Sequence, residues 1–98
     1  MIQLNVGNVL LKPSQRRQIM TCLRRAMKLG QRIGDFVLNL TMTRSGRSYE
    51  LRAAVHDRAG AFSYRIRRND WRGAVREIMH LVVARLHAQC LSRGAVAA

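Results

Sequence analysis

Three consecutive runs of alternating apolar and polar residues dominate the middle of this chain, at residues 36–43, 49–56 and 62–67. Because successive side chains of a strand point to opposite faces, each run predicts a strand with one dry and one wet face. The connections between them are short and contain Gly46 and Gly60, which is typical of tight turns. The three strands therefore predict an antiparallel meander whose apolar face needs a covering layer.

Segments with helical spacing lie on both sides of this meander. After Pro13, apolar residues recur every three or four positions and predict a helix ending near Gly30 and Gly34. Asn69-Asp70 is typical of a helix N-cap, and we expect a second helix from there to about Leu91, closed by Gly94. The apolar stripe expected on the first helix consists of Ile19, Cys22, Leu23, Ala26 and Met27.

A first strand is expected at residues 2–11, interrupted by Gly7-Asn8. The predicted fold class is therefore α+β in the order β-α-β-β-β-α, with a four-stranded mixed sheet and two helices packed on one face. We expect a single domain over residues 1–94, followed by a short tail at 95–98.

Charge narrows the function classes. The chain has 98 residues with 18 Lys and Arg against 5 Asp and Glu, and all but Lys12 and Lys28 of these cations are arginine. Planar guanidinium groups favour phosphate, so the composition predicts a compact module that binds nucleic acid, above all RNA. The candidate RNA-binding residues lie on both helices, at the first hairpin tip and on the last strand: Arg16, Arg17, Arg24, Arg25, Lys28, Arg32, Arg44, Arg47, Arg65, Arg67, Arg72, Arg76, His80 and Arg85.

Other classes lack support in the sequence. We find no paired carboxylates, phosphate-binding glycine loop or nucleophile motif, and we expect no enzyme and no cofactor. His80, His87 and Cys90 lack a fourth ligand and a known spacing, so no metal site is predicted. No segment is apolar enough to span a membrane, and two cysteines far apart suit buried or half-buried thiols in a cytoplasmic protein.

Several positions resemble the short ribosome hibernation promoting factors, also called ribosomal subunit interface proteins. That family has a Gly-Asn turn after its first strand, as in Val6-Gly7-Asn8-Val9 here, and a Gly ten positions before the Asp of its last helix, as Gly60 and Asp70 are. Ala74 and Val75 also match, and the likeness extends over about the whole chain. Three positions depart from the pattern: Arg72 replaces a usual Tyr, Arg76 an acid and Leu81 a common Lys.

The resemblance implies a non-catalytic factor that binds rRNA in the decoding channel of the small ribosomal subunit, blocks initiation and preserves idle ribosomes. It implies no small-molecule substrate. Longer members carry a C-terminal dimerising domain, which we expect this chain to lack; self-association stays open. Two alternatives also stay open, a general structured-RNA-binding module and an adaptor for an acidic protein. Periodicity does not decide whether the helices or the open sheet face meets RNA.

Overall fold

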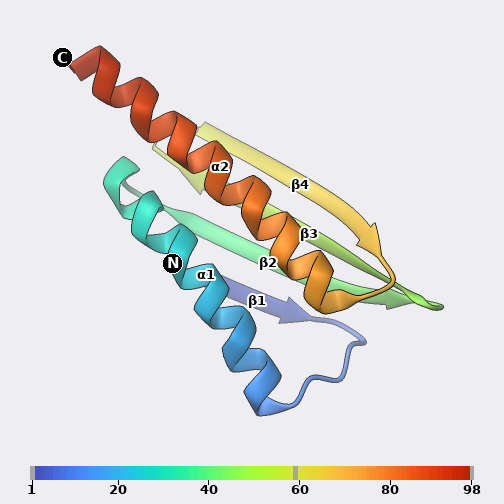
Figure 1. Ribbon diagram of the computed structural model, residues 1–98. Coiled ribbons are helices and arrows are strands. Elements are labelled where there is room, and N and C mark those ends of the chain that lie inside the picture. Colours follow the sequence, from blue (N-terminus) through green and yellow to red (C-terminus); the bar gives the residue numbers. More distant parts are fainter. Residues whose placement is uncertain (1, 59, 98) are drawn as a thin grey trace.

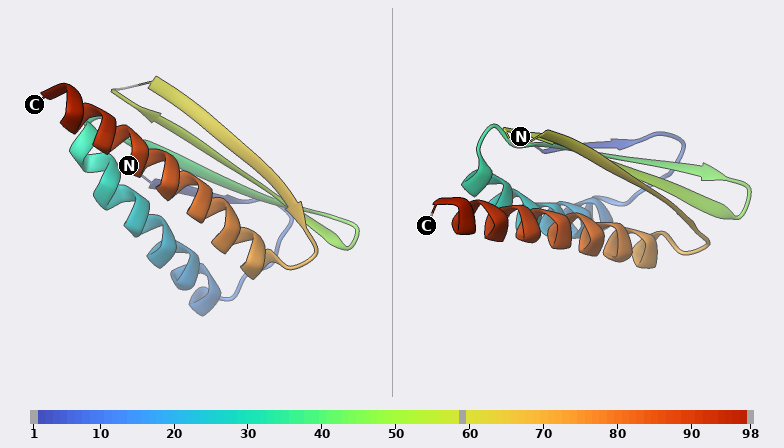
Figure 2. Two further views of the ribbon diagram at one scale, coloured as in Figure 1. Left: turned by 45° about the horizontal axis from the view of Figure 1, so that its top comes forward. Right: turned by 90° about the horizontal axis from the view of Figure 1, so that it is seen from above.

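The structure is a computed structural model that describes residues 2–58 and 60–97, with side chains described as far as Gln89. Its four strands form one sheet in the order β1-β2-β3-β4, and both helices lie on one face of it (Figures 1 and 2). The predicted fold class and element order are confirmed. The elements are β1 (Ile2–Val6), α1 (Pro13–Ile33), β2 (Val37–Ser45), β3 (Ser48–Asp57), β4 (Gly60–Arg68) and α2 (Trp71–Ala97).

The sheet is mixed because β1 runs parallel to β2, whereas β2, β3 and β4 are antiparallel neighbours. The crossover through α1 makes the parallel pair, and the meander makes the rest. Figure 1 shows α1 and α2 side by side and running in the same direction, with α1 nearer β1 and α2 nearer β4. The two helices therefore form one layer and the sheet the other.

The core lies between these layers and consists of the alternating residues predicted for the dry face. On β2, Leu38, Leu40 and Met42 are fully buried, and Leu51 and Ala53 on β3 lie beside them. The helices contribute the matching apolar surface, and burial of these side chains is the main force that holds the two layers together. The helical residues that are at most 1% exposed are Ile19, Leu23, Ala26, Ala74, Ile78, Val82 and Leu86.

The first strand ends at Val6, so the prediction of a strand as far as residue 11 is wrong beyond that residue. The side chain of Asn8 replaces strand pairing: its Nδ2 donates to the carbonyl oxygen of Arg44 at 2.7 Å, and its Oδ1 accepts from the backbone N–H of Arg44 at 2.7 Å. The chain then turns inward, so that Val9 is buried while Leu10 is 99% exposed.

Local chemistry explains both ends of α1. Pro13 occupies the first turn, and the Gln15 side chain accepts a hydrogen bond from the Lys12 backbone N–H at 2.8 Å. At the other end Gly34 adopts a φ of 98°, a conformation that costs glycine least, and donates its N–H to the carbonyl of Gly30 at 3.1 Å. Gly30 itself is buried within the helix.

The predicted N-cap of α2 is confirmed. The carboxylate of Asp70 accepts hydrogen bonds from the backbone N–H groups of Arg72 at 3.2 Å and Gly73 at 3.1 Å. These are two of the donors that a helix start leaves without intrahelical partners. The cap sets where α2 begins and how it leaves the last strand.

The predicted end of α2 is wrong, since the helix continues through Gly94 to Ala97 rather than closing at Gly94. A glycine ends a helix when it adopts a positive φ, and the residues that follow Gly94 are mainly alanine, the strongest helix former. The segment expected as a tail at 95–98 therefore extends the helix as far as residue 97.

Candidate nucleic-acid interface

The five acidic residues of the chain all take part in local interactions. Asp70 caps α2, and Oδ1 of Asp57 accepts the backbone N–H of Gly60 at 3.1 Å in the β3–β4 turn. The other three acids form ion pairs: Arg58–Asp35 at 3.2 Å, Arg65–Glu50 at 3.2 Å and Arg68–Glu77 at 2.6 Å. In the part of the chain that the structure describes, these contacts leave no acidic side chain to pair with the cations of α1.

The outward side of α1 carries a line of cations, which we call the α1 row. All of its members are exposed, and none belongs to an ion pair among the described residues. At 1.5 Å per residue the line extends about 22 Å, long enough to meet several phosphates in succession. The members of the α1 row are Arg17, Arg24, Arg25, Lys28 and Arg32.

Arg16 is also exposed but lies apart from the row. At 100° per residue it lies about 120° around α1 from the middle of the row, on the other flank of the buried stripe. The side of α1 opposite that flank borders α2. Within the row, Arg25 is the residue that lines a surface shared with α2.

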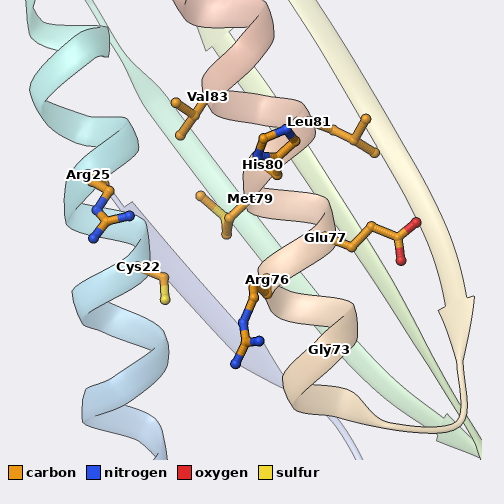
Figure 3. Close-up of a pocket in the computed structure, with 9 residues that line it drawn as sticks. All are labelled: Cys22, Arg25, Gly73, Arg76, Glu77, Met79, His80, Leu81 and Val83. Carbon is orange, nitrogen blue, oxygen red and sulfur yellow. The ribbon is translucent and has the colours of Figure 1, made fainter.

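A groove of about 610 Å³ lies between α1 and α2 (Figure 3). Cys22 and Arg25 line it from α1, and Arg76 and His80 from α2, with Met79 also in its lining. Arg25 and Arg76, which are far apart in sequence, thus border one concave surface whose apolar part comes from α2. A concave, partly apolar surface bordered by guanidinium groups can accept a phosphate and the sugar beside it.

The exposure of Cys22 corrects the sequence prediction, which placed it in the buried stripe of α1. The stripe that packs on the sheet is narrower than expected, and Cys22 lies at its edge beside the groove. Helix α2 packs alongside α1 without closing over that edge, so the thiol stays open. The side chain of Cys90 lies outside the described residues.

Arg72 lies at the start of α2, beside a smaller hollow that also touches α1. Its guanidinium carbon is 5.4 Å from the centre of the Trp71 ring, a cation–π contact. The hollow is lined by residues of both helices, including Gln18 and Cys22 as well as Arg72 and Arg76. Arg72, Arg76 and His80 thus lie at surfaces that both helices line, and Arg25 of the α1 row shares the larger of these with Arg76 and His80.

Three other predicted residues lie elsewhere. Arg85 is on the side of α2 that faces β4, with its guanidinium carbon 5.1 Å from the centre of the Phe62 ring. Arg65 and Arg67 lie on the open face of the sheet, and Arg65 is held by Glu50. These three residues therefore lie on other sides of the molecule than the α1 row.

The hairpin arginines occupy a third location, at the tip between β2 and β3. Arg44 lies 5.7 Å from the centre of the Tyr49 ring, and its Nε donates to the carbonyl of Gly46 at 3.2 Å. Arg47 is exposed at the same tip. The tip is at the end of the molecule where both helices begin (Figure 1), so it extends the cationic surface lengthwise.

The sequence prediction omitted Arg52 and His56, which line a hollow on the open face of the sheet together with Asn39. Their alternation in β3 placed them on the wet face, but no sequence signal indicated that short neighbouring side chains would leave a hollow there. Among the described residues no group of three or more metal-ligating side chains occurs. None of the helices, over the same residues, combines the length and apolarity needed to cross a bilayer.

No protein-family model matches this chain, and no curated protein matches it either. Solved structures, by contrast, are similar to it in fold. The N-terminal domain of Protein Y from Thermus thermophilus superposes with a TM-score of 0.72 over 86% of this chain and 91% of that one, at 13% identity. A ribosomal subunit interface protein from Coxiella burnetii superposes with a TM-score of 0.63 over 90% of this chain and 94% of that one, at 16% identity.

The chain shares their fold. The resemblance predicted from the Gly60–Asp70 spacing and the element order is thereby confirmed at the level of the fold. At 13% and 16% identity the likeness lies in the arrangement of strands and helices rather than in the surface residues.

Proposed function

We propose that this protein is a non-catalytic, ribosome-associated inhibitor of translation. In this proposal it binds rRNA in the decoding channel of the small subunit and stabilises idle ribosomes. The observation that carries the proposal is the α1 row, five exposed cations with no ion pair among the described residues, beside a groove bordered by Arg25 and Arg76. A partner rich in phosphate would supply the missing counter-charges.

The arrangement of the cations supports a large, structured RNA over an acidic protein. Arginines that border a shallow concave surface can each hold a phosphate in a bidentate manner, and phosphates recur at short intervals along RNA. The molecule is also elongated, with extents of 49, 22 and 17 Å, which suits a wedge lying within a nucleic-acid channel. Similarity in fold to a ribosomal subunit interface protein agrees with that choice.

Co-sedimentation with purified small subunits, large subunits and whole ribosomes tests the proposal, followed by a cell-free translation assay. We expect binding to the small subunit and to whole ribosomes, and a dose-dependent loss of translation. A naked structured RNA and an acidic protein serve as alternative partners in the same assay. Equal binding to naked RNA would favour a general RNA-binding module, and a protein that stays in the supernatant and leaves translation unchanged would refute the proposal.

A pair of double variants separates the helical surface from net charge. Arg25→Gln with Arg76→Gln removes both guanidinium groups that border the groove, whereas Arg58→Gln with Arg68→Gln removes two arginines that already have carboxylate partners. Both variants lose the same formal charge. We expect the groove variant to bind small subunits more weakly and the control variant to bind nearly as well as the parent.

A further inference from the structure

A hollow of about 370 Å³ lies on the face of the sheet turned away from both helices. It forms because the register places short side chains side by side: Ala54 of β3 opposes Ser63 of β4, with Ala61 nearby. The volume lies near the lower end of the range of about 300–1,000 Å³ that is typical of small-ligand sites. Small, uncharged side chains therefore form the floor of the hollow and leave room for a small planar group.

A polar group without a partner borders this hollow. Asn39 lies on the open face, since its neighbours Leu38 and Leu40 point into the core. Its Oδ1 is buried and has no hydrogen-bond partner among the described residues, although buried acceptors are almost always paired. The last side-chain torsion of asparagine is soft, so the amide can turn toward a ligand in the hollow and offer it an acceptor and a donor.

The rim of the hollow carries an arginine. Arg52 and His56, both exposed, line it from β3. The nearest acid along this strand, Glu50, is already held by Arg65 at 3.2 Å, and Arg52 belongs to no ion pair among the described residues. An anionic group at the rim would therefore find a guanidinium group that is available for it, and the His56 ring can stack on a planar neighbour.

We propose that this hollow binds one unpaired nucleotide of RNA, with the base on the alanine floor, its edge at Asn39 and its phosphate at Arg52. The edge of an unpaired base offers adjacent donors and acceptors, which complement an amide, and the phosphate complements the rim. A base already paired in a duplex cannot present that edge. The inference rests on the proposed function in one respect, namely that the nucleotide belongs to the RNA held by the helical surface.

Fluorescence anisotropy with a short labelled single-stranded RNA, and with the same sequence held in a hairpin stem, tests the inference. Ala54→Leu fills the hollow, and Asn39→Leu removes the amide while keeping a similar volume. We expect each to weaken single-strand binding by at least about tenfold, the loss typical of a base contact, and to leave stem binding unchanged. Asn39→Leu should also unfold at the same or a higher temperature, because it removes a buried acceptor that lacks a partner.

Two controls make the outcomes separable. Thr43→Leu adds the same apolar side chain to the open face of β2 outside the hollow, and it should bind both RNAs like the parent. Arg17→Gln with Arg24→Gln should weaken the single strand and the stem alike. Unchanged single-strand binding by Ala54→Leu would overturn the inference whatever the ribosome assays give. Loss of single-strand binding in a protein that does not sediment with ribosomes would support the hollow and refute the proposed function.

Discussion

Replacing Arg17 and Arg24 by glutamine removes two charges from the α1 row without touching the core. The two residues lie seven positions apart, so their side chains point to nearly the same side of α1 and are separated by about 10 Å along its axis. Both are exposed and neither belongs to an ion pair among the described residues. If each holds one phosphate, the double variant releases two fewer counterions on binding RNA.

The magnitude follows from the slope of log affinity against log salt, to which each phosphate contact contributes about 0.7–0.9. Two contacts are therefore worth about 1.4–1.8 in slope. Between about 0.1 and 0.2 M salt, the affinity of the parent should fall about threefold more than that of the variant. Glutamine and arginine have similar helix propensity, so the thermal unfolding temperature should not decrease.

The assay is binding of the labelled protein to purified small subunits over a range of monovalent salt at constant magnesium. Arg58→Gln with Arg68→Gln is the matched control, because it removes the same charge from two arginines that already face Asp35 and Glu77. Its slope should stay close to that of the parent. Equal slopes for all three proteins would refute the assignment of the α1 row as the phosphate-binding surface, and equal flattening of both variants would point to net charge alone.

Two further predictions concern the scaffold. Gly30→Ala should destabilise the protein by about 2 kcal/mol, because the new methyl group would overlap the buried ring of Phe36. This loss would outweigh the gain of about 1 kcal/mol that alanine normally gives a helix over glycine. Urea unfolding measures the change, with Gln31→Ala on the exposed side as the control, and a gain in stability for Gly30→Ala would contradict the packing described. Asp70→Ala removes the acceptor for the N–H groups of Arg72 and Gly73 and should lower the free energy of unfolding by about 1 kcal/mol. Asp70→Asn keeps an acceptor oxygen and should retain most of the stability. Equal losses of stability in the two variants would show that the cap hydrogen bonds are not the cause.

Much of the fold could be predicted from the sequence because the relevant signals are local. The alternation at residues 36–43 predicted the inward positions Leu38, Leu40 and Met42, and Asp70 predicted the start of α2. The end of β1 could not be found in this way. The residue that ends it, Asn8, acts on Arg44, which lies 36 positions away in the chain.

The same distinction between local signals and contacts of distant segments applies to the candidate site. Sequence by itself determined that the chain is strongly cationic, that α1 contains no acid and that its arginines are exposed, since charge and helical spacing are properties of neighbouring residues. Only the tertiary structure decided which cations lie together on one surface. Packing of α2 beside α1 placed Arg76 and Arg25 on one groove and turned Arg85 toward Phe62. Sheet register placed Asn39 among the small side chains of β3 and β4. These are contacts between distant segments, whose geometry depends on how complementary surfaces pack and not on any local pattern.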